Sequence, residues 1–368
     1  MSLIFSNLKL APSQISGGIR IVPVIRDNYT GTLRLQSQEY DEDLNITQVT
    51  KNISYISYVP HAFILSWSDD GVPLVSEGTQ IYKKNSKVTG SKYFSMRSSS
   101  KMIKKIDKNK IHFLPLHLAM ESFLNLYFKG PSISWDEYSG KIKATGLSPR
   151  IEYSYSGKYI DGLEEALRVF EIHENQVGVL LFVADKLASV FIVPHPEDYR
   201  SLHQSLLKDF YGELIYYYGY MYPSVSKFQV KIDDDKVNSL SDLRNELEQM
   251  KTDLTDFYKF MAEGILQKEL IFNDVYNVGQ HKLKRFMTDP DVNLENHIGE
   301  IIVDNDNNIE YLKTFHLSSE QVKKVVLLKN LDLHNWNLDE TATYMNTTKS
   351  KLIMNIEKLG FGYLIKAH

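Results

Sequence analysis

The segment at residues 178–194 has the sequence GVLLFVADKLASVFIVP, and it decides the class of fold that we expect. Two apolar runs, at 178–184 and 188–194, flank the polar pair Asp185 and Lys186. Apolar runs of this length on either side of a short polar turn are typical of a β-hairpin. The segment therefore predicts two neighbouring antiparallel strands.

This hairpin stands between earlier strand patterns and a later helix pattern. Further strands are predicted at 18–24, 53–59, 62–67 and 72–76. A helix is predicted from about residue 196 to residue 218, where the strand alternation is replaced by helical spacing. Strands followed by helices favour an α+β fold, with a mixed or antiparallel strand-rich body and packed helices, over a doubly wound parallel sheet.

Changes of pattern along the chain predict four parts. They are an α+β body at 1–232, a long amphipathic helix at 233–268, an acidic, Asn-rich connector at 269–315 and a helix-turn-helix domain at 316–368. Within the body, HFLPLHLAMESFLNLYFKG and FIVPHPEDYRSLHQSLLKDFYGELIYYYG each place a proline beside a histidine before an amphipathic helix. This similarity suggests that the body consists of two related halves, at 1–145 and 146–232.

The composition excludes several classes of protein. The chain has 368 residues, of which 43% are hydrophobic, and it contains no cysteine. Without cysteine it cannot form disulfides, thiolate metal sites or a cysteine nucleophile. No apolar run approaches the roughly 20 residues that span a bilayer, and the start, MSLIFSNLKL, lacks the features of a signal peptide. We therefore expect a cytoplasmic protein with no membrane partner.

The predicted helix at 233–268 carries one continuous apolar stripe. Its members are spaced as on one face of a helix: Leu240, Leu243, Leu247, Met250, Leu254 and Phe257. Such a stripe needs a covering partner, either the body or a second subunit. A homodimer is therefore one of the assemblies that we expect.

The C-terminal part has the most specific spacing in the chain. Residues 325–360 read VVLLKNLDLHNWNLDETATYMNTTKSKLIMNIEKLG. Asn346 suits the left-handed end of one short helix, and the hydroxyl of Thr348 or Ser350 suits the start of the next. The apolar residues of three short helices share a face in each: Val325, Leu328 and Leu331; Leu338, Ala342 and Met345; Leu352, Ile356 and Leu359. The pattern predicts an all-α trihelical unit whose last two helices form a helix-turn-helix.

This part resembles the factor-for-inversion-stimulation type of DNA-binding domain. The resemblance rests on Trp336-Asn337, Glu340-Thr341-Ala342, Leu352 and Leu359-Gly360. It implies that Lys349, Lys351 and Asn355 face the major groove of double-stranded DNA, where their side chains offer hydrogen-bond donors. Residues 319–368 contain seven lysines against five acidic residues, a weaker basic character than an autonomous DNA binder usually has. Packing or dimerisation is therefore the alternative role.

A basic run in the body is a candidate for binding anions. Residues 83–112 contain ten Lys or Arg against the single acidic residue Asp107. Lys101, Lys104 and Lys105 are candidate contacts to the phosphates of a nucleotide-type small molecule. The alternative is a solvated loop, because no glycine-rich phosphate loop of recognised spacing is present.

Arg150 is a further ligand-binding candidate. Its planar guanidinium can bind a phosphate or a carboxylate at two points. A structural ion pair is the alternative.

Candidate catalytic residues are histidines and glutamates of the body. His117 and Glu121 lie four apart on a helix predicted at 116–128, so they share a face. Glu171 and His173 alternate with apolar residues, as on one side of a strand, and either pair could do acid–base work. The alternatives are a core histidine with a carboxylate partner for the first pair and a satisfied polar face for the second.

His195 is the remaining catalytic candidate. It stands between two prolines at a predicted helix start, where it could act as a cap or a ligand. Each of the two pairs could also supply metal ligands, but no spacing-defined metal motif is present, so we expect no metal site, and the pattern names no cofactor.

Three stretches of the body resemble one known family. They are SYVPHAFILSW at 57–67, FLPLHLAMESFL at 113–124, and SGKYIDGLEEALRVFEIH with VPHPEDYRSLH within 156–203. The body is similar to the second of the ARG-and-rhodanese-phosphatase-superfamily-associated protein families, named for neighbours of ADP-ribosylglycohydrolase genes. The resemblance covers residues 1 to about 265 and implies a role in NAD or ADP-ribose metabolism. It supplies no catalytic residues.

Three functions follow as hypotheses. The first is a cytoplasmic regulator whose body binds a nucleotide-type ligand and whose C-terminal part binds DNA. The second is an enzyme acting on an ADP-ribose-like phosphorylated nucleoside, with the C-terminal part used for assembly. The third is a non-catalytic scaffold.

Overall fold

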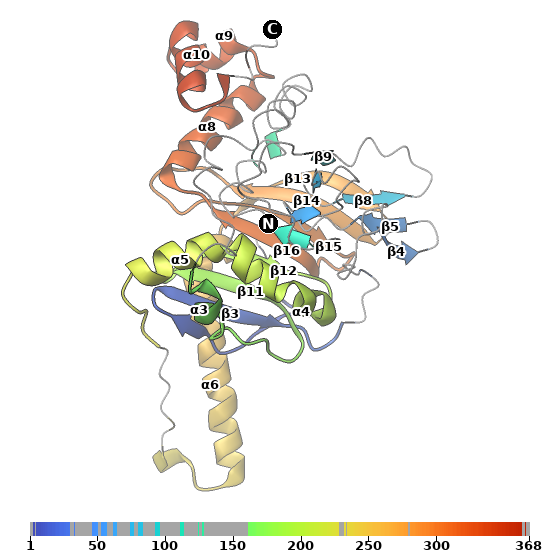
Figure 1. Ribbon diagram of the computed structural model, residues 1–368, viewed down its shortest axis with the longest axis vertical. Helices are drawn as coiled ribbons and strands as arrows, with labels where there is room; N and C mark the ends of the chain where they lie inside the picture. Colours follow the sequence, from blue (N-terminus) through green and yellow to red (C-terminus); the bar gives the residue numbers. More distant parts are fainter. Residues whose placement is uncertain are drawn as a thin grey trace.

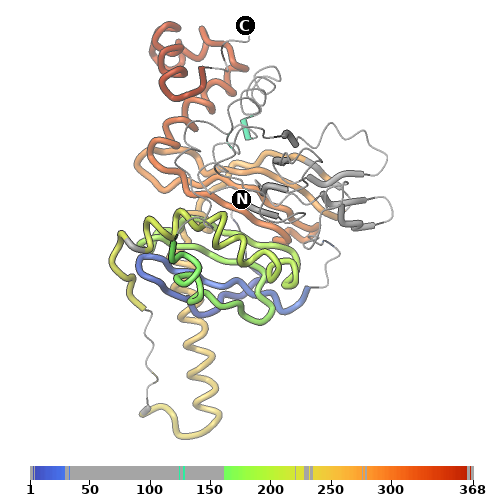
Figure 2. The backbone as a smooth tube through the Cα atoms, viewed as in Figure 1, coloured from blue at the N-terminus to red at the C-terminus, as the bar shows by residue number. Residues whose placement is uncertain are grey.

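A computed structural model gives the arrangement of the chain (Figure 1). It describes residues 3, 5–29, 33, 124, 127–128, 161–227, 232, 234–278, 280–362 and 365, together with seven short strands between residues 46 and 113. Figure 2 traces the same chain and draws in grey the remaining residues and also these seven short strands.

One antiparallel sheet forms the centre of the molecule. Its strands lie in the order β1 (Lys9–Leu10), β3 (Ile19–Ile25), β11 (Gln176–Val183), β12 (Lys186–Ile192), β16 (Ile309–His316), β15 (His297–Val303), β14 (His281–Thr288) and β13 (Leu270–Val278), and β2 (Gln14–Ser16) also pairs with β3. Helices pack on this sheet. The prediction of an α+β fold with an antiparallel, strand-rich body is therefore confirmed.

Two smaller antiparallel sheets contain the other strands. One has the order β10 (Ile111–Phe113), β6 (Ala62–Ile64), β7 (Leu74–Ser76) and β9 (Tyr93–Ser95), and the other has the order β4 (Ile46–Thr50), β5 (Ile53–Ile56) and β8 (Gln80–Lys83). The strands predicted at 53–59, 62–67 and 72–76 are present in shorter form.

The predicted hairpin forms, with its turn one residue earlier than expected. Val183 pairs with Lys186, so Ala184 and Asp185 make the turn. Both have positive φ, 47° and 61°, as a two-residue turn of type I′ requires. The Arg20 Nε donates to Asp185 Oδ1 at 2.9 Å and ties the turn to β3.

The helix predicted at 196–218 is interrupted. It consists of α4 (Pro196–Ser205), the π-helix η3 (Leu206–Phe210) and α5 (Gly212–Met221). The Tyr211 N–H donates to the Leu206 carbonyl at 3.0 Å, the wider bond that defines a π-turn. These helices and α3 (Leu163–Leu167) lie over one face of β3, β11 and β12 (Figure 1).

The segment 269–315, where the composition predicted a connector, forms β13 to β16. These strands continue the sheet because β12 pairs with β16, with Phe191 opposite Lys313. The Asp and Asn residues that suggested a linker gather in the turns between strands, where Asn307 has φ 61°. Every residue of β15 is buried. The sheet thus draws strands from both predicted halves and from the predicted connector.

Two apolar cores lie on opposite faces of the sheet. The first lies under α4, η3 and α5 and continues into α8 (Ser319–Leu333), α9 (Leu338–Tyr344) and α10 (Lys349–Lys358). The second lies under α6 (Leu240–Met261) and α7 (Glu263–Leu266). Neighbouring residues of one strand therefore contribute to different cores, as Leu180 and Leu181 of β11 do.

The helix α6 covers the sheet only with its C-terminal part. Its first turn is capped by the Ser239 side chain, which accepts from the Asp242 N–H, and a short 3-10 helix, η4 (Asp234–Lys236), precedes it. Tyr258 is buried in the second core, whereas Leu240 is 76% exposed and Leu247 is 40% exposed. The exposed part of α6 projects from the molecule at the end opposite α8, α9 and α10 (Figure 1).

Candidate functional site

The turn between α9 and α10 has the backbone that the sequence predicts. Asn346 takes the left-handed conformation, with φ 50°. Its N–H donates to the Thr343 carbonyl at 3.1 Å, and the Thr347 N–H donates to the Ala342 carbonyl at 2.9 Å. This pair of bonds is a Schellman motif, which satisfies the last carbonyls of α9. The chain is then free to start a second helix in a new direction.

The start of α10 is also set locally. The Thr348 side chain accepts from the Lys351 N–H at 3.3 Å and caps the helix. Leu352 and Ile356 are buried against α8 and α9. Because these two residues fix the inward face of α10, its opposite face lies in water.

The candidate DNA-binding residues are all exposed on or beside that outer face. Lys351 and Asn355 lie four residues apart, so their side chains are neighbours on the helix surface. Lys349 is also exposed, but its Nζ lies 2.7 Å from Asp339 Oδ2. This ion pair offsets part of the charge that Lys349 would offer to a phosphate.

Glu171 and His173 do not form the predicted strand. Residues 170–173 follow α3 as irregular chain, and Glu171 is exposed whereas His173 is half-buried. Their backbones make separate contacts: the Gln14 amide donates to the Glu171 carbonyl at 2.9 Å, and the His173 N–H donates to Gln176 Oε1 at 2.9 Å. The strand on which both side chains would share a face is absent, because this backbone bonds to the side chains of Gln14 and Gln176 in place of a strand ladder.

His195 is the N-cap of α4. Its Nδ1 accepts from the Glu197 N–H at 3.2 Å, and its ring meets that of Tyr29 edge to face at 4.6 Å. Pro196 takes the first helical position, where its missing N–H costs no hydrogen bond. The capping interpretation is therefore confirmed.

The other candidates lie outside the described residues. They are His117 and Glu121 of the predicted helix, Arg150, and the lysines Lys101, Lys104 and Lys105 of the basic run. Within the described part of the chain, Glu171, His173 and His195 do not converge on one site.

A buried row of charges was missed by the sequence analysis. Arg285, Glu300 and Lys313 lie side by side across β14, β15 and β16. The Arg285 Nε is 3.3 Å from Glu300 Oε1, and both Glu300 and Lys313 are fully buried. Burial lowers the pKa of Lys313 to about 7, against the opposing effect of Glu300. Groups perturbed in this way occur in functional sites and in structural ion networks alike.

Two histidines, the buried His297 and the half-buried His316, lie on the other face of the sheet. The rings of His297 and His316 are 5.2 Å apart. The His297 Nε2–H donates to the Leu187 carbonyl at 3.2 Å. Burial, followed by the neighbouring His316, lowers the pKa of His297 to about 3. This ring is therefore neutral in the folded chain at physiological pH.

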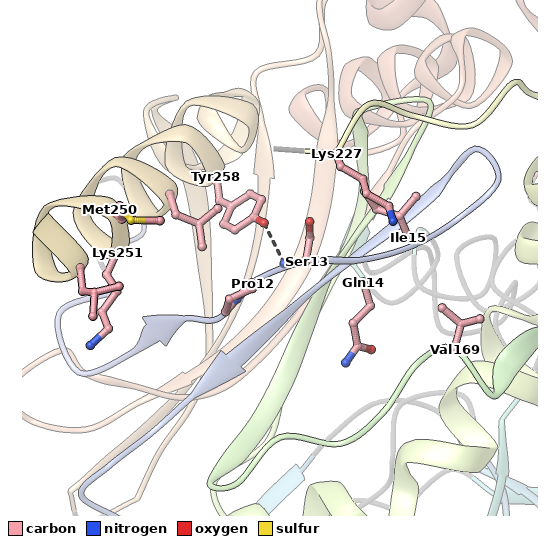
Figure 3. A pocket seen from close by; sticks show the side chains of 11 residues that line it. Pro12, Ser13, Gln14, Ile15, Val169, Lys227, Met250, Lys251 and Tyr258 are labelled. Carbon is pink, nitrogen blue, oxygen red and sulfur yellow. Dashed lines mark hydrogen bonds between the residues drawn. The ribbon is translucent and has the colours of Figure 1, made fainter. Parts of the chain in front are cut away.

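A cavity of about 630 Å³ lies where α6 leaves the sheet (Figure 3). One wall is formed by α6, with Met250, Leu254 and Tyr258, and the facing wall by residues 12–15. The Ser13 N–H donates to the Tyr258 hydroxyl at 2.8 Å and connects the two walls. Cavities of this size are typical of small-molecule sites.

Two features are absent from the described residues, a cluster of metal ligands and a membrane-spanning helix. Within the ranges given above, no three His, Asp or Glu side chains gather as a metal site would require. Nor do the helices of this part of the chain combine the length and the hydropathy needed to cross a bilayer.

Comparison with known proteins identifies a family for most of the chain. The family model described as ARPP-2 matches residues 3–279, which include β1 to β13 and end before the C-terminal helices. The resemblance found in the body is therefore confirmed. No curated protein and no solved structure matches the chain.

Proposed function

Because this chain belongs to the ARPP-2 family, we propose that it is a cytoplasmic regulatory protein linked to NAD or ADP-ribose metabolism. In this proposal the body binds a nucleotide-type small molecule, and α9 and α10 act as a helix-turn-helix that binds double-stranded DNA. A homodimer through the exposed part of α6 is a further part of the proposal.

One observation supports DNA binding above the others. The Asn346 turn sets α10 apart from α9, and α10 buries Leu352 and Ile356 while Lys351 and Asn355 stay exposed. A recognition helix needs this combination, because its inner face must hold the helix rigidly and its outer face must reach the groove.

Fluorescence anisotropy of the full chain with random duplex DNA tests the proposal. Affinity should fall by about 3.5-fold per phosphate contact between 50 and 200 mM salt, because each contact releases counterions. Lys351→Ala should weaken binding and lower the slope of log affinity against log salt by about one.

Lys323→Ala is the matched control. Lys323 lies on α8, is exposed, and pairs with Glu320 at 2.5 Å. We expect its loss to leave both affinity and slope nearly unchanged. Three outcomes would contradict the DNA-binding role. They are no binding, binding that does not depend on salt, and equal effects of Lys351→Ala and Lys323→Ala.

The enzyme alternative remains a separate hypothesis. It predicts turnover of an ADP-ribose-like phosphorylated nucleoside that survives deletion of residues 318–368. Assaying the deleted chain beside the full chain distinguishes it from the regulator. The scaffold alternative predicts neither turnover nor ligand binding.

A further inference from the structure

A cavity lies beside α6, apart from the candidate DNA-binding helices α9 and α10. The residues that line it can make several kinds of contact with a ligand. Figure 3 shows α6 on one side and residues 12–15 on the other, with Val169 and Lys227 completing the lining. The two walls come from segments more than 200 residues apart in the sequence. Only the folded chain brings them together.

Two hydroxyl groups line the cavity, and that of Ser13, which is half-buried, can donate a hydrogen bond to a ligand. The Tyr258 hydroxyl accepts from the Ser13 N–H, and the Ser13 Oγ accepts from Arg20 Nη1 at 3.1 Å. A hydroxyl that accepts a bond still carries its own proton for donation. Tyr258 is only 1% exposed, so its position is held by packing. The cavity therefore offers the Ser13 hydroxyl as a hydrogen-bond donor, on a wall that the buried Tyr258 holds in place.

Positive charge lines the same cavity. Lys227 and Lys251 stand on different walls, and both are exposed. Lys251 Nζ lies 2.7 Å from Glu248 Oε1, but both side chains are more than two-thirds exposed. An exposed ion pair of this kind contributes little to stability, so the Lys251 side chain can contact a bound anion instead. The two lysines favour a ligand that carries negative charge.

Apart from the Gln14 amide, the remaining lining is apolar. Ile15 and Val169 face Met250 and Leu254 across the cavity. Flat rings pack well on such side chains, and the methionine sulfur makes favourable contacts with aromatic rings. An inorganic anion would leave this apolar surface uncovered. The lining instead suits a molecule with a flat apolar group.

We infer that this cavity binds a small organic anion that carries a flat apolar group, the chemistry of a nucleoside phosphate. The inference rests on the proposed ligand-binding function and gives that function a location. The Ser13 hydroxyl, the two lysines and the apolar walls each recognise a different part of such a ligand.

Calorimetric titration of the full chain with AMP, ADP-ribose, adenosine and pyrophosphate tests the inference. At least one of the two nucleoside phosphates should bind, and adenosine and pyrophosphate should each bind about tenfold more weakly or not at all, since each lacks half of the recognised chemistry. Raising the salt concentration should weaken binding, because the lysines are exposed.

Two pairs of variants test whether the ligand binds in this cavity. Lys251→Glu should weaken it about tenfold by replacing attraction with repulsion. Its control is Lys259→Glu, which changes an exposed lysine of the same helix that also has an acidic partner three residues earlier, Asp256. Val169→Asp should weaken binding similarly, and its control is Val292→Asp; the two valines are 49% and 54% exposed, so neither change disturbs a core.

The outcomes separate this inference from the DNA-binding proposal. Binding that weakens in Lys251→Glu and Val169→Asp but not in their controls supports the cavity. Binding that all four variants retain would place the ligand elsewhere and overturn the inference, while leaving a ligand-binding regulator intact. Failure of every compound to bind at millimolar concentration would also overturn it, and DNA binding measured on the same samples would show whether the rest of the proposal stands.

Discussion

Lowering the pH from 7 to 5 should destabilise the folded chain through His297. This imidazole is completely buried, and its Nε2–H donates to the Leu187 carbonyl at 3.2 Å. Its Nδ1 has no hydrogen-bond partner among the described residues. Burial, with a smaller effect of His316, lowers its pKa to about 3. The His297 imidazole is therefore protonated much less readily in the folded chain than in the unfolded chain.

The magnitude follows from linkage. The pKa of an unperturbed histidine is about 6.5, so between that value and the folded-state pKa the unfolded chain binds a proton that the folded chain does not. The free energy of unfolding therefore falls as the pH falls, by about 2 kcal/mol between pH 7 and pH 5 for one such group. Any folded-state pKa below about 4 gives nearly the same loss, because the unfolded-state pKa sets the titration in this range.

Urea unfolding at pH 7, 6 and 5, followed by tryptophan fluorescence, measures this loss. The comparison is with His297→Gln, whose side-chain amide can still donate to Leu187. We expect this variant to be less stable at pH 7 but to lose about 2 kcal/mol less than the wild type on going to pH 5. His173→Gln, which replaces a half-buried histidine outside the sheet, is the control. Equal losses in the wild type and His297→Gln would refute the reasoning.

Two further predictions concern the backbone. Gly299→Ala should destabilise the sheet by about 2 kcal/mol or more, because a Cβ there would lie 2.4 Å from the Lys313 carbonyl oxygen and 2.5 Å from the Phe286 ring; urea unfolding beside Gly219→Ala, whose nearest contact would be 3.4 Å, checks it. Asn346→Val should destabilise the C-terminal helices by about 1–2 kcal/mol, because a β-branched residue tolerates φ 50° poorly, whereas Asn346→Gly should be nearly neutral. Thermal unfolding of the two Asn346 variants decides this, and equal midpoints would contradict it.

Local patterns predicted the elements that depend on neighbouring residues. The hairpin of β11 and β12 is confirmed, with its turn one residue earlier, at Ala184 and Asp185, which both have positive φ. The Thr348 cap of α10 and the Asn346 end of α9 are likewise interactions over three to five residues. Such interactions are visible in a sequence because both partners lie within one short window.

The segment 269–315 shows where a local pattern was insufficient. Its average composition is acidic and rich in Asn, but most of its Asp and Asn residues lie in the turns, at 289–296 and 304–308, and most of its apolar residues lie in β13 to β16. The average over the whole segment therefore indicated neither the turns nor the strands. The charged residues of these strands were missed for the same reason, although Arg285, Glu300 and Lys313 form a buried row.

The candidate sites also differ in whether neighbouring residues or distant segments determine them. The exposed positions of Lys351 and Asn355 followed from the spacing of Leu352 and Ile356, because one helix face is buried and the other is not. The cavity beside α6 could not be predicted, since its walls are far apart in the chain.

The sequence by itself determined the α+β class, the hairpin, the caps and the spacing of the C-terminal helices, because each depends on propensity or on contacts between near neighbours. Only the tertiary structure decided that β12 pairs with β16, that Lys313 and His297 are buried, and that α6 meets residues 12–15 around a cavity. These features depend on which apolar surfaces meet when distant segments pack together, and that choice minimises the free energy of the whole chain rather than of any one segment.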